Sequence, residues 1–282
     1  MTTPVNESMI SAIKHIAHQA GQAILDVYGK KQRSIKEKPD QTPVTEADLL
    51  ANEIILAGLN AVQPHYPILS EESAHQPLAQ RKRWQRHWLV DPLDGTQEFI
   101  NRNGQFTVNI ALMEANYPIL GIVYAPTTHT FYWGGEHYGS FRQEKSGEVK
   151  SITTRRIAKG QKITTLGSRS YSNSASNKFI EKLHSYFESI QFFQVGSSLK
   201  GCKIAEGSAD IYPRLGPTSE WDTAAVQAII EGAGGSVLNR YGRRFKYNYK
   251  ESLTNDIFVM LGDPKIDWHR FWNLTNLPDI TK

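Results

Sequence analysis

The chain has 282 residues, of which 39% are hydrophobic, 21% are charged and one is cysteine, and its formal net charge is +4. This length allows one large domain or two ordinary ones. No apolar run approaches the about 18 residues that a membrane-spanning helix needs, and the N-terminus lacks the pattern of a signal peptide. The single cysteine, Cys202, excludes an intramolecular disulfide, so we expect a cytoplasmic protein with a buried thiol.

Two helices are predicted at the start of the chain. The first carries apolar residues at three- and four-residue steps and ends at Gly29: Ile10, Ile13, Ala17, Ala20, Ile24 and Val27. The second begins near Thr45, stops before Pro64, and has the apolar residues Leu49, Leu50, Ile54, Ile55 and Leu59. Its first residues, "TEAD" at positions 45–48, match a capping box in which Asp48 replaces the usual glutamate, and structure alone explains them.

The remaining pattern changes near residue 150. Strands are predicted at residues 68–69, 88–90, 107–113, 119–124 and 131–133, and the third and fourth form a hairpin around "EANYP". Later strands at residues 164–166, 192–195, 209–212 and 257–261 alternate with helices at 176–190, 198–206 and 223–231. We therefore predict an α/β fold with two domains, residues 1–150 and 151–282, of which the first has two helices on a mostly antiparallel sheet.

The segment "WLVDPLDGTQEF", residues 88–99, delivers two aspartates directly after a strand. Pro92 stiffens the bend, and two carboxylates held a few ångströms apart repel by about 4 kcal/mol at an effective dielectric of 20. Hard cations such as Mg²⁺ relieve this repulsion and bind carboxylate and carbonyl oxygens, and Leu93 offers a carbonyl between Asp91 and Asp94. Gly95 permits close approach of a ligand, and amides at Gly95 and Thr96 would suit a phosphate.

Other interpretations of this segment exist. Asp-Pro and Asp-Gly are common turn dipeptides that need no metal. An EF-hand is excluded, because counting from Asp91 its third, fifth and twelfth positions hold Leu93, Gly95 and Arg102. A haloacid-dehalogenase-type phosphatase also places a strand before "DxDGT", but here the two acids stand one residue further apart.

Further acids stand at suitable places in the chain. "SEES" puts Glu71 and Glu72 after a short apolar strand, and "EWDTAA" puts Asp222 at the start of a predicted helix. The usual role of an acid at a helix start is capping. Each position alone has this structural explanation, whereas their joint order is distinctive.

In that order, "PVTEAD", "SEES", "DPLDGT", "WDTAA" and "EGAGG" resemble the motifs of the inositol monophosphatase superfamily of Mg²⁺-dependent, lithium-sensitive phosphatases. The segment "VGSSLKGCKIAEGSADIYPRLGPTSEWDTAA" is similar to the CysQ-type branch, the 3′(2′),5′-bisphosphate nucleotidases. This resemblance covers the chain from the first helix to the last strand. It implies a layered α/β/α/β/α sandwich.

The resemblance also implies roles for single residues. The metal ligands would be Glu71, Asp91, Asp94, Asp222 and the Leu93 carbonyl, holding two or three Mg²⁺ ions. Thr96, with Asp48 as its partner, and Glu71 would orient the attacking water, and the Gly95 and Thr96 amides would hold the scissile phosphate. Ser197, Lys200 and Arg214 would contact the rest of the nucleotide, including its second phosphate.

Two positions depart from the family pattern. Val226 stands where "WDxAAG" usually ends in glycine, and Gly201 stands where an aromatic often follows the lysine. Neither position would supply a ligand. These departures concern substrate fit and packing, not the chemistry.

The implied reaction is in-line attack of a metal-activated water on the 3′-phosphate of adenosine 3′,5′-bisphosphate, giving AMP and phosphate, as in sulfur metabolism. One alternative is a phosphatase of the same superfamily that acts on inositol monophosphate or a sugar bisphosphate. The other is a non-enzyme that binds RNA or another polyanion, which would explain the basic run at residues 81–86, although this run and the one at 240–246 are more typical of a solvated face or loop. We expect a monomer or homodimer, no nucleic-acid partner and no integral membrane segment; the resemblance also allows peripheral attachment to the inner membrane.

Overall fold

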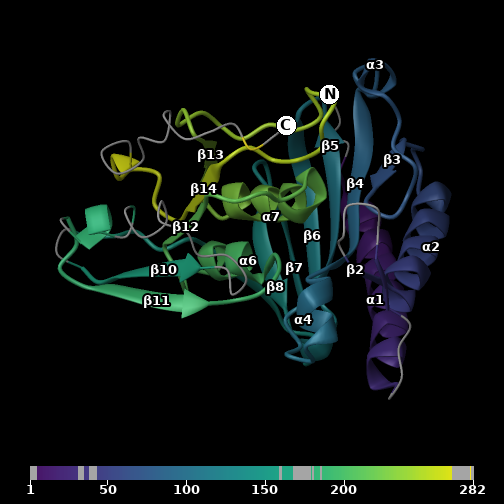
Figure 1. Ribbon diagram of the computed structural model, residues 1–282, viewed down its shortest axis with the longest axis horizontal. Helices are drawn as coiled ribbons and strands as arrows, with labels where there is room; N and C mark the ends of the chain where they lie inside the picture. The colour runs from purple at the N-terminus through teal and green to yellow at the C-terminus, as the bar shows by residue number, and fades with distance from the viewer. Residues whose placement is uncertain are drawn as a thin grey trace.

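The computed structural model layers helices and two β-sheets against one another (Figure 1). It describes residues 5–30, 35–37, 43–158, 161–167, 179, 181–184, 186–268 and 280. No helix within these ranges has both the length and the apolar character to cross a membrane.

Helices α1 (Glu7–Gly29) and α2 (Glu46–Ala61) form the first layer. Asn6 caps α1 by accepting a hydrogen bond from the Met9 amide at 2.8 Å, and α1 ends at Gly29 as predicted. Thr45 and Asp48 form the predicted capping box of α2. Leu49 and Leu50, two of the apolar residues of this predicted helix, lie outside its buried face. They are 43% and 36% exposed, because the inward face of α2 runs through residues spaced four apart: Ala47, Ala51, Ile55 and Leu59.

The larger sheet has the strand order β3-β4-β5-β6-β7-β8-β9. Its strands are β3 (Ile68–Ser70), β4 (Arg86–Asp94), β5 (Thr107–Glu114), β6 (Tyr117–Ala125), β7 (Thr130–Gly135), β8 (Gly139–Gln143) and β9 (Val149–Ile152). β3 and β4 run parallel and the other neighbours antiparallel, so the predicted hairpin of β5 and β6 is confirmed. Short helices α3 (Leu78–Arg81), α4 (Thr96–Ile100) and η1 (Pro126–Thr128) and the strand pair β1 (Ile35–Glu37) and β2 (Pro43–Thr45) complete this half.

Helix α7 (Glu220–Gly232) covers the opposite face of this sheet from α1 and α2 (Figure 1). It lies directly on β6, since a Cβ atom on Gly121 would stand 1.9 Å from the carbonyl oxygen of Ala225. Helix α6 (Leu199–Ala205) packs beside α7. Cys202 of α6 is fully buried in this layer, and burial raises the pKa of its thiol well above the usual range.

The second sheet has the order β11-β10-β12-β14-β13 and contains β10 (Ile163–Gly167), β11 (Ile190–Gln194), β12 (Ile211–Arg214), β13 (Ser236–Asn239) and β14 (Phe258–Leu261). Its inner face presents Tyr212, Phe258 and Met260 to the α6/α7 layer. Its outer face packs against Leu183, Phe187 and Trp268. The succession of layers confirms the predicted α/β sandwich, while the division into domains at residue 150 stays a prediction.

The predicted helix at 176–190 is only partly described. Residues 176–178, 180 and 185 lie outside the described ranges, and residues 181–184 are helical. Residues 186–189 are not helical, so that part of the prediction is wrong. The chain there already borders the sheet, because the Ile163 amide donates a hydrogen bond to the Ser189 carbonyl at 3.0 Å and β11 begins at Ile190.

Two arginines of the basic runs are buried, which corrects their interpretation as solvated. Arg81 is 1% exposed and donates hydrogen bonds to Asn248 Oδ1 and to backbone carbonyls, among them that of Glu251. Arg240 is 5% exposed and pairs with Asp256. Both guanidinium groups therefore hold loops of the second half in place.

Candidate active site

A β-bulge shapes the segment that carries the paired aspartates. Asp91 pairs with Asn109 and Asp94 pairs with Thr107, so Pro92 and Leu93 together oppose one residue of β5. Proline fits here because a bulged position needs no amide hydrogen for the ladder. The Leu93 amide donates to Asp91 Oδ1 at 3.0 Å, and the Leu93 carbonyl lies 3.3 Å from the Thr96 hydroxyl.

Three carboxylates from separate elements meet beside this bulge. One oxygen each from Glu71, Asp91 and Asp222 lies within 4.8 Å of the other two. Glu71 and Asp91 are neighbours because β3 and β4 are parallel and in register, with the Glu71 amide donating to the Val90 carbonyl at 3.1 Å. Asp222 reaches them from the first turn of α7.

Burial and mutual repulsion disfavour the charged forms of these acids. The pKa of Asp91 is raised well above its ordinary value, first by burial and then by the charges of Glu71, Asp94 and Asp222. Burial, followed by Asp94 and Glu71, likewise raises the pKa of Asp222. An all-oxygen donor set under such repulsion fits a hard divalent cation such as Mg²⁺.

Asp222 is both a capping residue and a member of this cluster. α7 begins three residues earlier than predicted, so its N-cap is Ser219 and Asp222 occupies the third helical position of a capping box. Asp222 Oδ2 accepts a hydrogen bond from the Ser219 amide at 3.0 Å. A carboxylate has two oxygens, so capping leaves the other one available to a ligand.

Asp94 lies next to the cluster and is held by residues that sequence reasoning missed. Its Oδ2 accepts hydrogen bonds from the Ser198 amide at 2.6 Å and from Asn109 Nδ2 at 3.3 Å. The Ser198 hydroxyl in turn donates to the Asp222 carbonyl at 2.6 Å, so Ser198 bonds to both aspartates. Ser198 thus connects the bulge of the first sheet to the start of α7. Within "GSSLK" the sequence pattern indicates Ser197 but not its neighbour Ser198.

Asp48 and Thr96 form the predicted pair. Asp48 Oδ1 accepts from the Thr96 hydroxyl at 3.1 Å, and Oδ2 accepts from the amide and hydroxyl of Thr45 at 2.8 and 2.6 Å. Burial raises the pKa of Asp48, and the hydrogen bonds from Thr45 act in the opposite direction. The start of α2 therefore fixes the Thr96 hydroxyl at the edge of the bulge.

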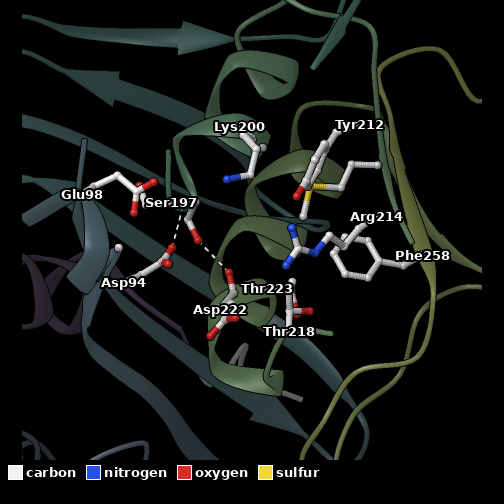
Figure 2. A pocket seen from close by; sticks show the side chains of 14 residues that line it. Asp94, Glu98, Ser197, Lys200, Tyr212, Arg214, Thr218, Asp222, Thr223 and Phe258 are labelled. Carbon is white, nitrogen blue, oxygen red and sulfur yellow. Dashed lines mark hydrogen bonds between the residues drawn. The ribbon is translucent and has the colours of Figure 1, made fainter. Parts of the chain in front are cut away.

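A cavity of about 200 Å³ opens beside Asp94 and Asp222. Figure 2 shows that Ser197, Lys200 and Arg214 face this cavity together with Tyr212 and Phe258. Lys200 Nζ donates to the Val195 carbonyl at 3.3 Å and lies 5.4 Å from the centre of the Tyr212 ring. Arg214 donates to the Pro217 carbonyl at 2.7 Å. The structure thus brings the predicted nucleotide-contacting residues to the same place as two of the acids.

Carboxylates from two parallel strands and a helix start, gathered next to a basic pocket, are the arrangement of a metal-dependent phosphatase. Residues 5–259 match the model of the inositol monophosphatase family, and the chain belongs to this family.

Relatives with curated names agree with this assignment. The 3′(2′),5′-bisphosphate nucleotidase CysQ of Salmonella typhimurium is 43% identical over 251 residues, which are 89% of this chain and 98% of that protein. CysQ of Haemophilus influenzae is 37% identical over 270 residues, covering 94% and 96% of the two chains. The crystal structure of CysQ from Bacteroides thetaiotaomicron superposes with a TM-score of 0.80 at 34% identity, over 92% of this chain and 99% of that one.

Proposed function

We propose that this protein is a Mg²⁺-dependent 3′(2′),5′-bisphosphate nucleotidase that hydrolyses the 3′-phosphate of adenosine 3′,5′-bisphosphate to AMP and phosphate. The observation that carries the proposal is that the chain is 43% identical, over 89% of its length, to a protein of that name. The convergence of Glu71, Asp91 and Asp222 beside a pocket with Lys200 and Arg214 supports it.

In this proposal the ligands of two or three Mg²⁺ ions are Glu71, Asp91, Asp94, Asp222 and the Leu93 carbonyl. When bound, Mg²⁺ would supply Lewis acidity that lowers the pKa of a water molecule and neutralises charge on the phosphoryl group. The donor set fits, because these five groups offer only oxygen atoms.

The remaining residues hold the reactants and direct one proton. Asp48 accepts the hydroxyl hydrogen of Thr96, so the lone pairs of Thr96 Oγ1 are left to accept a hydrogen from the attacking water, together with Glu71. The Gly95 and Thr96 amides hold the scissile phosphate. Ser197, Lys200 and Arg214 hold the other end of the nucleotide, where the two cations suit a second phosphate.

The location of the protein is part of the proposal. The single cysteine favours the cytoplasm. Peripheral membrane attachment gains no support from the described residues. The oligomeric state, monomer or homodimer, stays a prediction.

A substrate comparison tests the function. Purified protein is assayed for phosphate release from adenosine 3′,5′-bisphosphate, adenosine 2′,5′-bisphosphate, inositol monophosphate and fructose 1,6-bisphosphate, each with Mg²⁺ and with EDTA. We expect the highest kcat/KM for the nucleotides and no turnover in EDTA. A preference for inositol monophosphate or the sugar would replace the nucleotide assignment by a neighbouring activity of the same family.

A further inference from the structure

Glu98 is an acid of the pocket to which none of the roles above applies. It lies on α4, lines the cavity with Gly95, Ser197 and Lys200, and faces it from the opposite side to Arg214 (Figure 2). Among the described residues, its carboxylate has no hydrogen-bond or ion-pair partner. The pocket thus holds an acceptor that the protein itself does not use.

Two glycines make room for this side chain. A Cβ atom on Gly196 would lie 2.7 Å from Glu98 Cγ, and one on Gly95 would lie 3.4 Å from Glu98 Oε2. The carboxylate therefore lies against the main chain at Gly95, next to the place proposed for the scissile phosphate. Neither glycine has a side chain that would occupy this space, so the partly buried Glu98 side chain extends along the edge of the cavity.

The chemistry of a carboxylate narrows what that group is. An ionised carboxylate only accepts hydrogen bonds, and it repels phosphate oxygens. The sugar of adenosine 3′,5′-bisphosphate has one hydrogen-bond donor, the 2′-hydroxyl, on the carbon next to the scissile ester. A carboxylate beside the scissile phosphate that accepts a hydrogen bond from the sugar must therefore accept it from this hydroxyl.

We propose that Glu98 is a specificity-determining residue that accepts a hydrogen bond from the hydroxyl vicinal to the scissile phosphate. This inference rests on the proposed nucleotidase function and extends it. The 2′,5′ isomer also presents a phosphate and a hydroxyl on adjacent carbons, so Glu98 accommodates both isomers. A 2′-deoxynucleotide lacks the donor and leaves the carboxylate unpaired beside the substrate.

The test compares adenosine 3′,5′-bisphosphate with 2′-deoxyadenosine 3′,5′-bisphosphate. For the wild-type protein we expect kcat/KM to be about 10- to 100-fold higher for the hydroxyl-bearing substrate, the range for a hydrogen bond to a charged group. In Glu98→Ala the preference falls below about threefold, because only the better substrate loses an interaction. Glu98→Gln keeps an acceptor without the charge and gives an intermediate preference.

Gln97→Ala is the matched control. Gln97 is the exposed neighbour on the same helix and bonds to Asn101, so its loss leaves the wild-type preference unchanged. If Glu98→Ala fails to fold, the preference of Glu98→Gln decides.

Several results would overturn the inference. They are a wild-type protein without preference, an equal loss for both substrates in Glu98→Ala, and a shift in the Mg²⁺ concentration for half-maximal rate, which would make Glu98 a metal ligand. Failure of the nucleotidase function itself looks different: the wild-type protein would release phosphate from inositol monophosphate and from neither nucleotide.

Discussion

Asp91 illustrates at the scale of one residue how the proposed chemistry opposes stability. Its carboxylate is 1% exposed and has four other acids near it, and both circumstances raise its pKa. Without a cation, the folded state must accommodate a charge that water would solvate better. The site is therefore a place where the chain gives up stability for a function.

Asp91→Asn should separate these two effects. Asparagine has the same shape and can still accept the hydrogen bond from the Leu93 amide through its own Oδ1. We expect the metal-free variant to melt at a higher temperature than the metal-free wild type at neutral pH, because the repulsion is gone. We expect kcat to fall by at least about 100-fold, since even residues that only hydrogen-bond to metal ligands contribute about 10- to 100-fold to metal affinity or activity.

The measurements are thermal unfolding in EDTA and steady-state kinetics at saturating Mg²⁺. Asp26→Asn, an exposed carboxylate on α1 that bonds to Gln22, is the control and should change neither quantity. Near-normal turnover of Asp91→Asn would refute its assignment as a metal ligand.

Lys200 allows a second prediction at this scale. Its ammonium lies in the pocket near Tyr212, at the end assigned to the second phosphate. Lys200→Ala should raise KM for adenosine 3′,5′-bisphosphate by about tenfold or more and leave KM for adenosine 3′-monophosphate nearly unchanged. Lys203→Ala removes a lysine of the same helix that pairs with Glu206 at 2.6 Å, and should alter neither value. Equal increases for both substrates in Lys200→Ala would show that Lys200 does not contact the second phosphate.

The sequence alone pointed to the acids but not to the residues that hold them. Glu71, Asp91, Asp94 and Asp222 follow apolar strands or begin a helix, and this placement is visible in a string of letters. Ser198 and Asn109 act through hydrogen bonds between segments about 90 residues apart, which no local pattern indicates. Glu98 is likewise indistinguishable from a solvated helix residue until its pocket is known.

At the scale of elements, the two departures from the family pattern prove to be neighbours. Gly201 lies on α6 and Val226 on α7, and a Cβ atom on Gly201 would stand only 2.3 Å from Val226 Cγ2. The space that a side chain on Gly201 would occupy is filled by the larger side chain of Val226. Neither departure is explained by itself, but together they allow α6 and α7 to pack closely at this point.

This contact predicts that the effect of Gly201→Ala on the free energy of unfolding changes sign when Val226 is replaced by alanine. Gly201→Ala should destabilise the wild-type protein by about 1–3 kcal/mol, because the β-branched Val226 cannot move aside. In a Val226→Ala background the same substitution should be neutral or stabilising by up to about 1 kcal/mol, the helix preference of alanine over glycine.

Urea unfolding of the four proteins measures the coupling between the two positions. Gly29→Ala, at a helical glycine with no atom within 4 Å of the added Cβ, shows the effect of the substitution without a clash. Equal effects of Gly201→Ala in both backgrounds would mean that the helices do not touch at this point.

Elements with strong apolar periodicity were predictable and weakly patterned ones were not. α1, α2, β5 and β6 matched the prediction because each buries a continuous stripe or face. β8 and β13 were missed, since they are short and only partly buried. The start of α7 was predicted too late, at residue 223, because Glu220 and Trp221 add no apolar periodicity to the helix. These two residues are instead held by the capping box of Ser219 and Asp222 and by the hydrogen bond from the Glu220 amide to the Leu253 carbonyl.

At the scale of the whole molecule, the site forms where the layers meet. The first sheet supplies Glu71, Asp91 and Asp94, α7 supplies Asp222, and the second sheet with α6 supplies Arg214 and Lys200. The alternation of predicted helices and strands indicated the layers. Which strand ends lie next to one another depends on the order of the strands in each sheet, and the local sequence does not show this order. For that step the family resemblance supplied what local physics did not.

Because these acids converge, we expect the stability of the whole chain to depend on protons and on a bound cation. The folded pKa values of Asp91 and Asp222 lie above their unfolded values near 3.9. The folded state therefore binds more protons than the unfolded state above about pH 4. The stability contributed by these two groups is present below that pH and is lost as pH rises through the raised folded pKa values.

In the proposed site Mg²⁺ would take the place of the missing protons, so its stabilising effect should grow with pH. At a hundredfold excess over its dissociation constant, Mg²⁺ should stabilise the fold by about 2.7 kcal/mol at pH 8, and by less at pH 5, where protons compete for the same oxygens. The measurement is the melting temperature at both pH values in Mg²⁺ and in EDTA, at constant ionic strength set with NaCl. Glu206 and Asp263, whose pKa values are lowered by other contacts, titrate alike with and without the metal, so the difference between the two curves isolates the cluster. A melting temperature indifferent to Mg²⁺ at both pH values, or a larger gain at pH 5, would show that these carboxylates do not share a cation.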